Sequence, residues 1–260
     1  MLLLLLSANA GAQRPPIRAY TTEDGLASDI VRRLVRDPNG FLWLCTTNGL
    51  SRFDGERFTT YTPETGLPHA SINDLLVTHR GRYLLATNGG GVVAFDVSSA
   101  PSAADASSRR RTSEPRPDAW RFRAYRVGTQ AATNRVNLFM QDRRGRIWVG
   151  TDGGLFVLER WREPFRFVRV PLLLATPDSS VQVWAFAEDR EGSLWIGTGV
   201  GLTRRLPDGR LVHYEWSTSR GRMLGLAYAR NGILWVGHDG GVTAIVPEPV
   251  SSLEIGKGAA

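Results

Sequence analysis

The sequence predicts an all-β fold assembled from about five copies of one structural unit. A short motif recurs along the chain: a turn glycine, an apolar strand with Trp at its third position in most copies, a second Gly-rich turn and another apolar strand. One more apolar stretch precedes each copy and another follows most of them, so the unit contains four short strands. Helical periodicity is nearly absent. Four-stranded antiparallel units of about 40 residues with Gly, Asn and Asp at their turns are typical of β-propeller blades.

One glycine anchors each copy, and the copies extend the predicted propeller over residues 17–250. The anchors are Gly40, Gly81, Gly145, Gly192 and Gly232, which lie 41, 64, 47 and 40 residues apart. Three positions after them stand the residues on which we centre the five blades: Trp43, Leu84, Trp148, Trp195 and Trp235. We name the four strands of a blade a to d, from the propeller axis outward.

The first residues, 1–13, resemble the remnant of a signal peptide. An apolar run, Leu2–Leu6, is followed by Ala8-Asn9-Ala10, an A-x-A pattern that signal peptidase could cleave. We therefore expect an exported protein.

A further apolar segment, Ile17–Tyr20, precedes the first blade and reads as a strand d without its own a, b and c strands. An N-terminal outer strand closes many propellers by completing the last blade, and the fifth copy needs such a strand. Two architectures follow. The five blades form a closed ring completed by Ile17–Tyr20, or they are part of a larger ring.

The long step between the second and third anchors contains an insertion at residues 97–119. This segment is rich in Ser, Ala, Pro and Arg and shows no apolar period, so we expect a disordered loop between strands c and d of the second blade. Residues 251–260 are expected to form a tail.

The repeated residues have structural explanations. The Trp of strand b can fill the wedge between neighbouring blades, and the small residue two positions later, as in Gly150 and Gly197, lets adjacent sheets approach closely. The Asn-Gly and Asp-Gly pairs suit hairpin turns that need positive φ. Charged pairs such as Glu188-Asp189 are expected to be solvated at the a–b turns.

Composition argues against several function classes. The net charge of +7 is nearly all arginine, but it is dispersed, so no nucleic-acid partner is expected. The single cysteine, Cys45, excludes an internal disulfide, and the four histidines show no metal-ligand spacing. Phosphate-binding, hydrolase and zinc-protease motifs are missing, so we expect no cofactor, no metal and no enzymatic activity in this chain.

One stretch, Gly25–Thr62, closely resembles the two-component regulator propeller repeat, with its apolar strand, Asp-x-x-Gly turn, Leu-Trp strand and Asn-Gly-Leu turn. The resemblance covers nearly the whole chain after residue 16. It implies an extracytoplasmic, periplasmic sensor propeller of a bacterial two-component signal transduction protein, often a histidine kinase. It also implies a small-molecule or glycan-derived ligand and a homodimer through propeller association. The membrane anchor and kinase output domain that usually follow are missing here, so a fragment is expected.

The expected binding face gathers the b–c turns and d–a loops, which should converge near the axis. The ligand-binding candidates on it are Asn48, Asn88, Thr151, Asp152, His238, Asp239, Asp24 and His69. Two alternatives stay open. Streptogramin lyases are propeller enzymes with a related repeat and would use a histidine, for which His238 is better placed than His213. A generic protein-interaction propeller is the other.

Overall fold

The computed structural model describes residues 17–95, 122–160, 162, 164–214, 216 and 222–250. The expected signal-peptide remnant at residues 1–13, the insertion at residues 97–119 and the tail at residues 251–260 lie outside the described residues.

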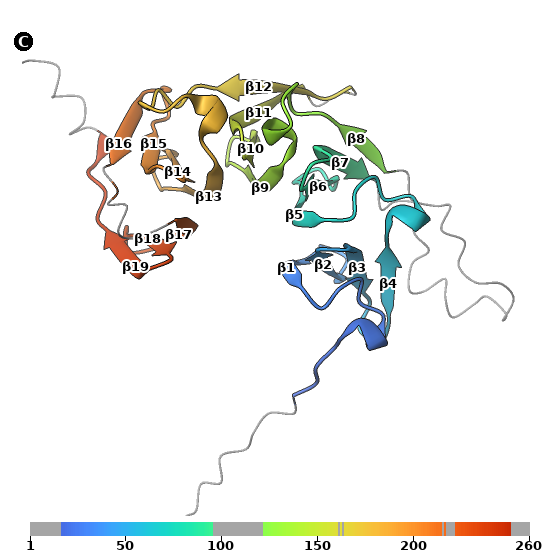
Figure 1. Cartoon of the computed structure of the whole chain (residues 1–260). Coiled ribbons are helices and arrows are strands. Elements are labelled where there is room, and N and C mark those ends of the chain that lie inside the picture. Colours follow the sequence, from blue (N-terminus) through green and yellow to red (C-terminus); the bar gives the residue numbers. More distant parts are fainter. Residues whose placement is uncertain are drawn as a thin grey trace, which may run out of the picture.

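The described chain forms five antiparallel sheets placed side by side in an arc, which confirms the all-β propeller architecture (Figure 1). We number these sheets as blades one to five. Blades one to four have four strands each, and blade five has three. The strands of blades one and two are β1 (Val31–Arg36), β2 (Leu42–Thr46), β3 (Gly49–Phe53), β4 (Phe58–Tyr61), β5 (Ile72–Val77), β6 (Tyr83–Thr87), β7 (Val92–Phe95) and β8 (Arg123–Tyr125). Those of blades three to five are β9 (Val136–Gln141), β10 (Ile147–Thr151), β11 (Gly154–Arg160), β12 (Arg166–Val170), β13 (Val183–Glu188), β14 (Leu194–Thr198), β15 (Leu202–Arg205), β16 (Leu211–Tyr214), β17 (Met223–Tyr228), β18 (Leu234–His238) and β19 (Gly241–Ile245).

Each strand a lies on the inner side of the arc, and single 3-10 turns precede four of these strands (Figure 1). The turns are η1 (Thr22–Asp24), η2 (Pro63–Thr65), η5 (Ala132–Asn134) and η6 (Asp178–Ser180). Two of them, η1 and η2, end in a left-handed glycine, Gly25 and Gly66, followed by a buried leucine.

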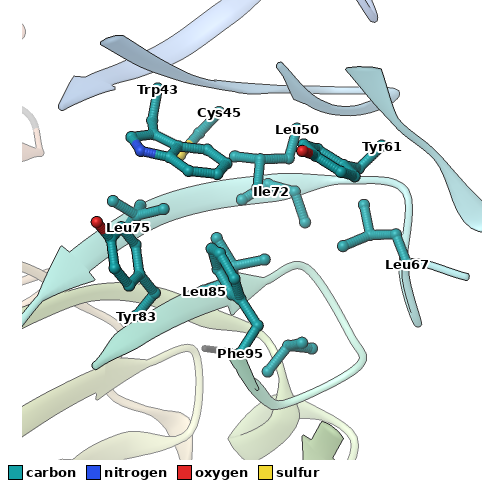
Figure 2. Close-up of a cluster of buried hydrophobic side chains, with 11 residues drawn as sticks. Trp43, Cys45, Leu50, Tyr61, Leu67, Ile72, Leu75, Tyr83, Leu85 and Phe95 are labelled. Carbon is teal, nitrogen blue, oxygen red and sulfur yellow. The ribbon is translucent and has the colours of Figure 1, made fainter. Parts of the chain in front are cut away.

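The core lies between the blades, where apolar side chains of one sheet meet the next sheet. Figure 2 shows Trp43 and Tyr61 of blade one facing Tyr83 and Phe95 of blade two. The rings of Trp43 and Phe95 lie 5.6 Å apart between centroids. Trp148 and Trp195 occupy the same place towards blades four and five. The prediction that the strand-b Trp fills the wedge is therefore correct for these three blades.

A buried carboxylate holds each of these indoles. The Trp43 indole N–H donates to Asp37 at 2.9 Å, and the Trp148 and Trp195 indoles donate to Asp142 and Asp189 at 3.0 Å. The prediction that Asp189 is solvated is wrong, because its side chain is buried and also binds the guanidinium of Arg204 at 2.7 Å. The Asp at the start of the a–b turn is therefore part of the core.

The small residue after the Trp also acts as predicted. A Cβ on Gly150 would lie 2.5 Å from Leu138 Cδ2 and 2.9 Å from Val183 Cγ1, an atom of the next blade. Close approach of blades three and four therefore requires glycine at this position.

The segment Ile17–Tyr20 does not close the ring. It forms no strand, and the Tyr20 ring packs on Phe53 and Phe58 of blade one at 5.3 and 5.4 Å between centroids. Within the described residues, no strand pairs with the outer edge of β19. Of the two architectures considered, the five-blade ring completed by Ile17–Tyr20 is therefore not the one that the described residues form, since Tyr20 packs on blade one. Blades one and five are the two ends of an open arc (Figure 1).

Candidate functional site

The d–a loops and b–c turns meet at one end of the blades, which we call the loop face. In all five blades, a backbone N–H after strand b donates to a carbonyl just before strand a, at 3.0 to 3.3 Å. The five pairs are Thr47 to Ile30, Asn88 to Ser71, Asp152 to Arg135, Gly199 to Gln182 and Asp239 to Arg222. The loops that the sequence assigns to the binding face therefore share one surface.

The b–c turns are held by a threonine that ends strand b. The Thr151 hydroxyl donates to the Gly154 carbonyl at 2.8 Å and accepts from the Gly153 N–H at 3.0 Å. Thr151 is buried, so this candidate side chain stabilises the turn and is not presented to a ligand. An Asp-Gly pair was expected to supply the positive φ of this turn. In the structure, the residue with positive φ is Gly154, which follows the pair Asp152-Gly153.

The histidine His238 replaces this threonine in blade five. Its Nε2 lies 3.0 Å from the Thr243 hydroxyl, and its Nδ1 accepts from the Gly240 N–H at 3.2 Å. The ring also meets Trp216 edge-on at 5.2 Å. Both ring nitrogens are therefore engaged within blade five.

The remaining candidates differ in how they meet solvent. Asn48 and Asn88 are exposed at the tips of their turns. Asp24 is exposed too, but its carboxylate accepts the Thr21 N–H at 2.9 Å and so caps η1. His69 is half-buried, with Nδ1 accepting the Ser71 N–H at 3.2 Å and its ring against the glycines of the blade-two turn.

The two aspartates of the turns each face an arginine. Asp152 lies 3.9 Å from Arg135 and accepts the Asn137 amide at 3.0 Å. Asp239 accepts the backbone N–H and the side chain of Arg222 at 3.0 and 3.2 Å, and these bonds lower the pKa of its carboxyl. The loop face therefore presents carboxylate and guanidinium groups together.

A further set of residues, which the sequence reasoning missed, runs along the inner side of the arc. The second residue of each strand a forms this inner row: Arg32, Asn73, Asn137, Trp184 and Leu224. Hydrogen bonds connect part of the row from blade to blade. Arg32 donates to Asn73 at 2.7 Å, Asn73 to the Val136 carbonyl at 2.7 Å, and Asn137 to the Val183 carbonyl at 3.1 Å.

A sequence signal for the inner row exists. A polar residue stands directly after the first apolar residue of strand a in "VRRLV", "INDLL" and "VNLFM". In a strand with one buried face, that position points away from its apolar neighbours. In the structure, it places amide and guanidinium groups beside the loop face at the inside of the arc.

The chemistry offered is hydrogen bonding and charge. Arginine and asparagine side chains supply donors, while Asp152 and the amide oxygens supply acceptors. Within the described ranges, no group of three His, Cys, Asp or Glu side chains could hold a metal ion, and no helix is long and apolar enough to cross a membrane. Such an inventory suits recognition of a polar ligand.

Comparison with known proteins agrees with the repeat pattern. Residues 25–48, 131–153 and 177–199 match the model of the family described as two component regulator propeller. These segments run through the a–b region of blades one, three and four. No curated protein sequence matches the chain.

Several solved structures share the fold. The extracellular domain of BT3049 of B. thetaiotaomicron, described as part of a hybrid two component system, is 20% identical with a TM-score of 0.64, over 86% of this chain and 28% of that one. PorZ, a surface component of the type-IX secretion system of Porphyromonas gingivalis, is 18% identical with a TM-score of 0.64, over 88% and 34%. Virginiamycin B lyase from Staphylococcus aureus is 13% identical with a TM-score of 0.59, over 85% and 70%. The chain thus spans about a third or less of the length of the BT3049 and PorZ structures.

Proposed function

Because the chain carries repeats of the two-component regulator propeller family, we propose that it is an extracytoplasmic sensing module of a bacterial two-component signal transduction protein. In this role the chain recognises a ligand or partner and performs no chemistry itself. The location is periplasmic or otherwise exported. The extracellular domain of BT3049, which shares the fold, comes from a protein described as a hybrid two component system, and this supports the location.

The inner row is the observation that carries the ligand-sensing part of the proposal. Arg32 is exposed and holds Asn73, while Asn137 lies beside Asp152. Groups held by neighbours lose little freedom on binding, so preorganised donors and acceptors favour recognition. A polar small molecule or a glycan-derived ligand matches these groups because hydroxyl groups both donate and accept.

In this proposal, signalling occurs when the ligand shifts the equilibrium between two ways in which propellers associate. A ligand changes an equilibrium only as far as it binds one state more tightly than the other. In this proposal the ligand favours one arrangement of two propellers, which form a homodimer in the membrane-bound protein. The anchor and the output domain belong to the longer protein that this role requires.

A binding experiment tests the proposal. The purified chain is titrated calorimetrically with a panel of neutral and uronic-acid-containing oligosaccharides. We expect at least one to bind, and we expect Arg32→Ala to weaken its binding about 10- to 150-fold, the range of one charged hydrogen bond. Arg80→Ala, an exposed arginine at the a–b turn of blade two, is the matched control and should bind as the wild type does.

Two outcomes count against the proposal. If no oligosaccharide binds, the glycan class is wrong. If Arg32→Ala and Asp152→Ala both bind a ligand as tightly as the wild type, the loop face beside the inner row is the wrong site.

The lyase alternative has one supporting observation, the fold shared with virginiamycin B lyase, together with a histidine on the loop face. The bonds of His238 to Thr243 and Gly240 disfavour it as a general base, because its ring nitrogens are already used. We expect no cleavage of quinupristin by the purified chain. Cleavage that His238→Ala abolishes would replace sensing by catalysis as the function.

A further inference from the structure

The two ends of the arc are halves of the same kind of interface. In blade one, the Trp43 ring faces blade two and the neighbouring strand-d residue Tyr61, which lies 6.2 Å away between ring centroids. In blade four, Trp195 meets Tyr214 at 5.2 Å in the same way. In these two blades, the contact with the next sheet therefore combines a strand-b Trp with a strand-d Tyr and the apolar side chains of that sheet.

Within the part of the chain that the structure describes, blade five presents the first half of this contact without the second. Trp235 is 42% exposed, whereas Trp43 and Trp195 are fully buried. Val242 is 68% exposed, whereas Leu50 and Leu202, which begin strand c in the same way, are buried. Val242 pairs with Gly237, two residues from Trp235, so both side chains lie on one face of the sheet. We call this apolar surface the blade-five end.

Blade one presents the other half. Leu34 and Leu44 are paired across β1 and β2 and point away from blade two, and Leu34 is 57% exposed. On the same face, Phe53 and Phe58 are covered only in part, by Tyr20. We call this surface the blade-one end.

The residues before β1 have the local structure that follows a strand d. Tyr20 precedes η1 and the left-handed Gly25 by the same spacing that separates Tyr61 from η2 and the left-handed Gly66. Tyr20 also packs on Phe58 at 5.4 Å, much as Tyr61 packs on Phe122 at 5.9 Å. Ile17–Tyr20 therefore stands where the outer strand of a preceding blade would stand.

We propose that the blade-five end of one copy binds the blade-one end of a second copy. The segment Ile17–Tyr20 of the second copy adds along β19 as the fourth strand, which the described residues of blade five do not supply, and Trp235 packs on Tyr20 and Phe53. By the register of β3 with β4, Tyr20 pairs with Val242 and Arg18 with Ala244. Backbone hydrogen bonds along a free sheet edge provide affinity, and the buried Trp provides specificity.

The occupant is a second copy because each end supplies what the other lacks. Within its own chain, Tyr20 packs on blade one, and the segment leaves the arc at the end opposite to β19 (Figure 1). The contact is heterologous, since two different surfaces meet, so association continues head to tail as the concentration rises.

Solution mass tests the association. The molar mass of the chain, 28.7 kDa as a monomer, is measured by light scattering at a series of protein concentrations. We expect the mass to rise above that of the monomer with concentration. Trp235→Ala and Val242→Arg, which alter exposed side chains, should return the protein to a monomer without changing its circular dichroism spectrum. A wild type that stays monomeric throughout the series overturns the proposal.

Cysteine pairing tests the register. Two single variants, Arg18→Cys and Ala244→Cys, are mixed and oxidised, so that only contact between copies can give a mixed disulfide. We expect this covalent dimer. A mixture of Arg18→Cys with Asp208→Cys, at an exposed turn of blade four, is the control and should give far less. Equal yields overturn the pairing, as does a double variant R18C/A244C that forms its disulfide only within one chain.

Discussion

The bond between the buried Asp and the indole makes a quantitative prediction in blade three. Asp142 accepts the Trp148 indole N–H at 3.0 Å and the Arg146 backbone N–H at 2.8 Å. Blade two carries a natural substitute for this arrangement: Thr78 and Leu84 take the places of the Asp and the Trp. The Thr78 hydroxyl accepts the Arg82 backbone N–H at 3.1 Å, so threonine still closes the turn.

This precedent separates the effects of the two residues. Asp142→Thr keeps the turn but leaves the Trp148 N–H without an acceptor in the core, which we expect to cost about 2–3 kcal/mol in unfolding free energy. Trp148→Leu removes buried ring area and costs about 2–4 kcal/mol. In the double variant no indole N–H is left without an acceptor. Its loss of unfolding free energy should therefore be smaller than the sum of the two single losses by about 1–3 kcal/mol.

Urea denaturation followed by far-ultraviolet circular dichroism measures these free energies, because it does not depend on Trp148 as a probe. The slope of free energy against urea must stay constant among the variants for the comparison to hold. If the two single losses add to the double loss within about 0.5 kcal/mol, the indole bond has no role of its own in joining the blades.

Three further predictions use the same denaturation assay or simple labelling. Gly150→Ala should cost about 1–3 kcal/mol in unfolding free energy, because the added Cβ meets Leu138 and Val183. Gly237→Ala, at the same position in blade five, should be nearly neutral, because an added Cβ would have its nearest neighbour 3.9 Å away. Similar losses of unfolding free energy in the two variants would contradict the assigned contact. Burial raises the pKa of the Asp74 carboxyl, so its protonation favours the folded state, and the stability it contributes is lost as pH rises through the raised pKa. Asp74→Asn should therefore flatten the fall in stability above about pH 4, the unfolded value, and an unchanged pH profile would refute the assignment. Burial also raises the pKa of the Cys45 thiol, so iodoacetamide should label it only after unfolding, and rapid labelling of the native chain would show that blade one opens.

The fold was predictable because its determinants are local and repeated. A turn glycine, a small residue five positions later and, in four of the five copies, a Trp between them fix the strands of one blade, and the repetition leaves little ambiguity. The loop face was predictable as well, since strand order alone places the d–a loops and b–c turns at one end.

Side-chain environments were harder to predict because they depend on the neighbouring blade. Asp189 was expected to be solvated on account of its charge, yet Trp195 and Arg204 bury it. Thr151 looked like a ligand group at a turn, although its hydroxyl closes that turn. Arg32 and Asn73 were overlooked because the polar position in strand a has meaning only once the blades are set around the inside of the arc.

The segment Ile17–Tyr20 shows where local information ends. Its sequence predicts an outer strand, but the segment forms no strand in the structure, although the 3-10 turn and the left-handed Gly25 that follow it match those that follow β4. Nothing local specifies which sheet edge it joins, because backbone groups along any exposed edge offer the same hydrogen bonds. The partner is decided by side chains that must meet across the new interface, here Tyr20 and Trp235. In the single chain these two rings belong to opposite ends of the arc, so an encounter between copies can join them where folding of the described chain has not.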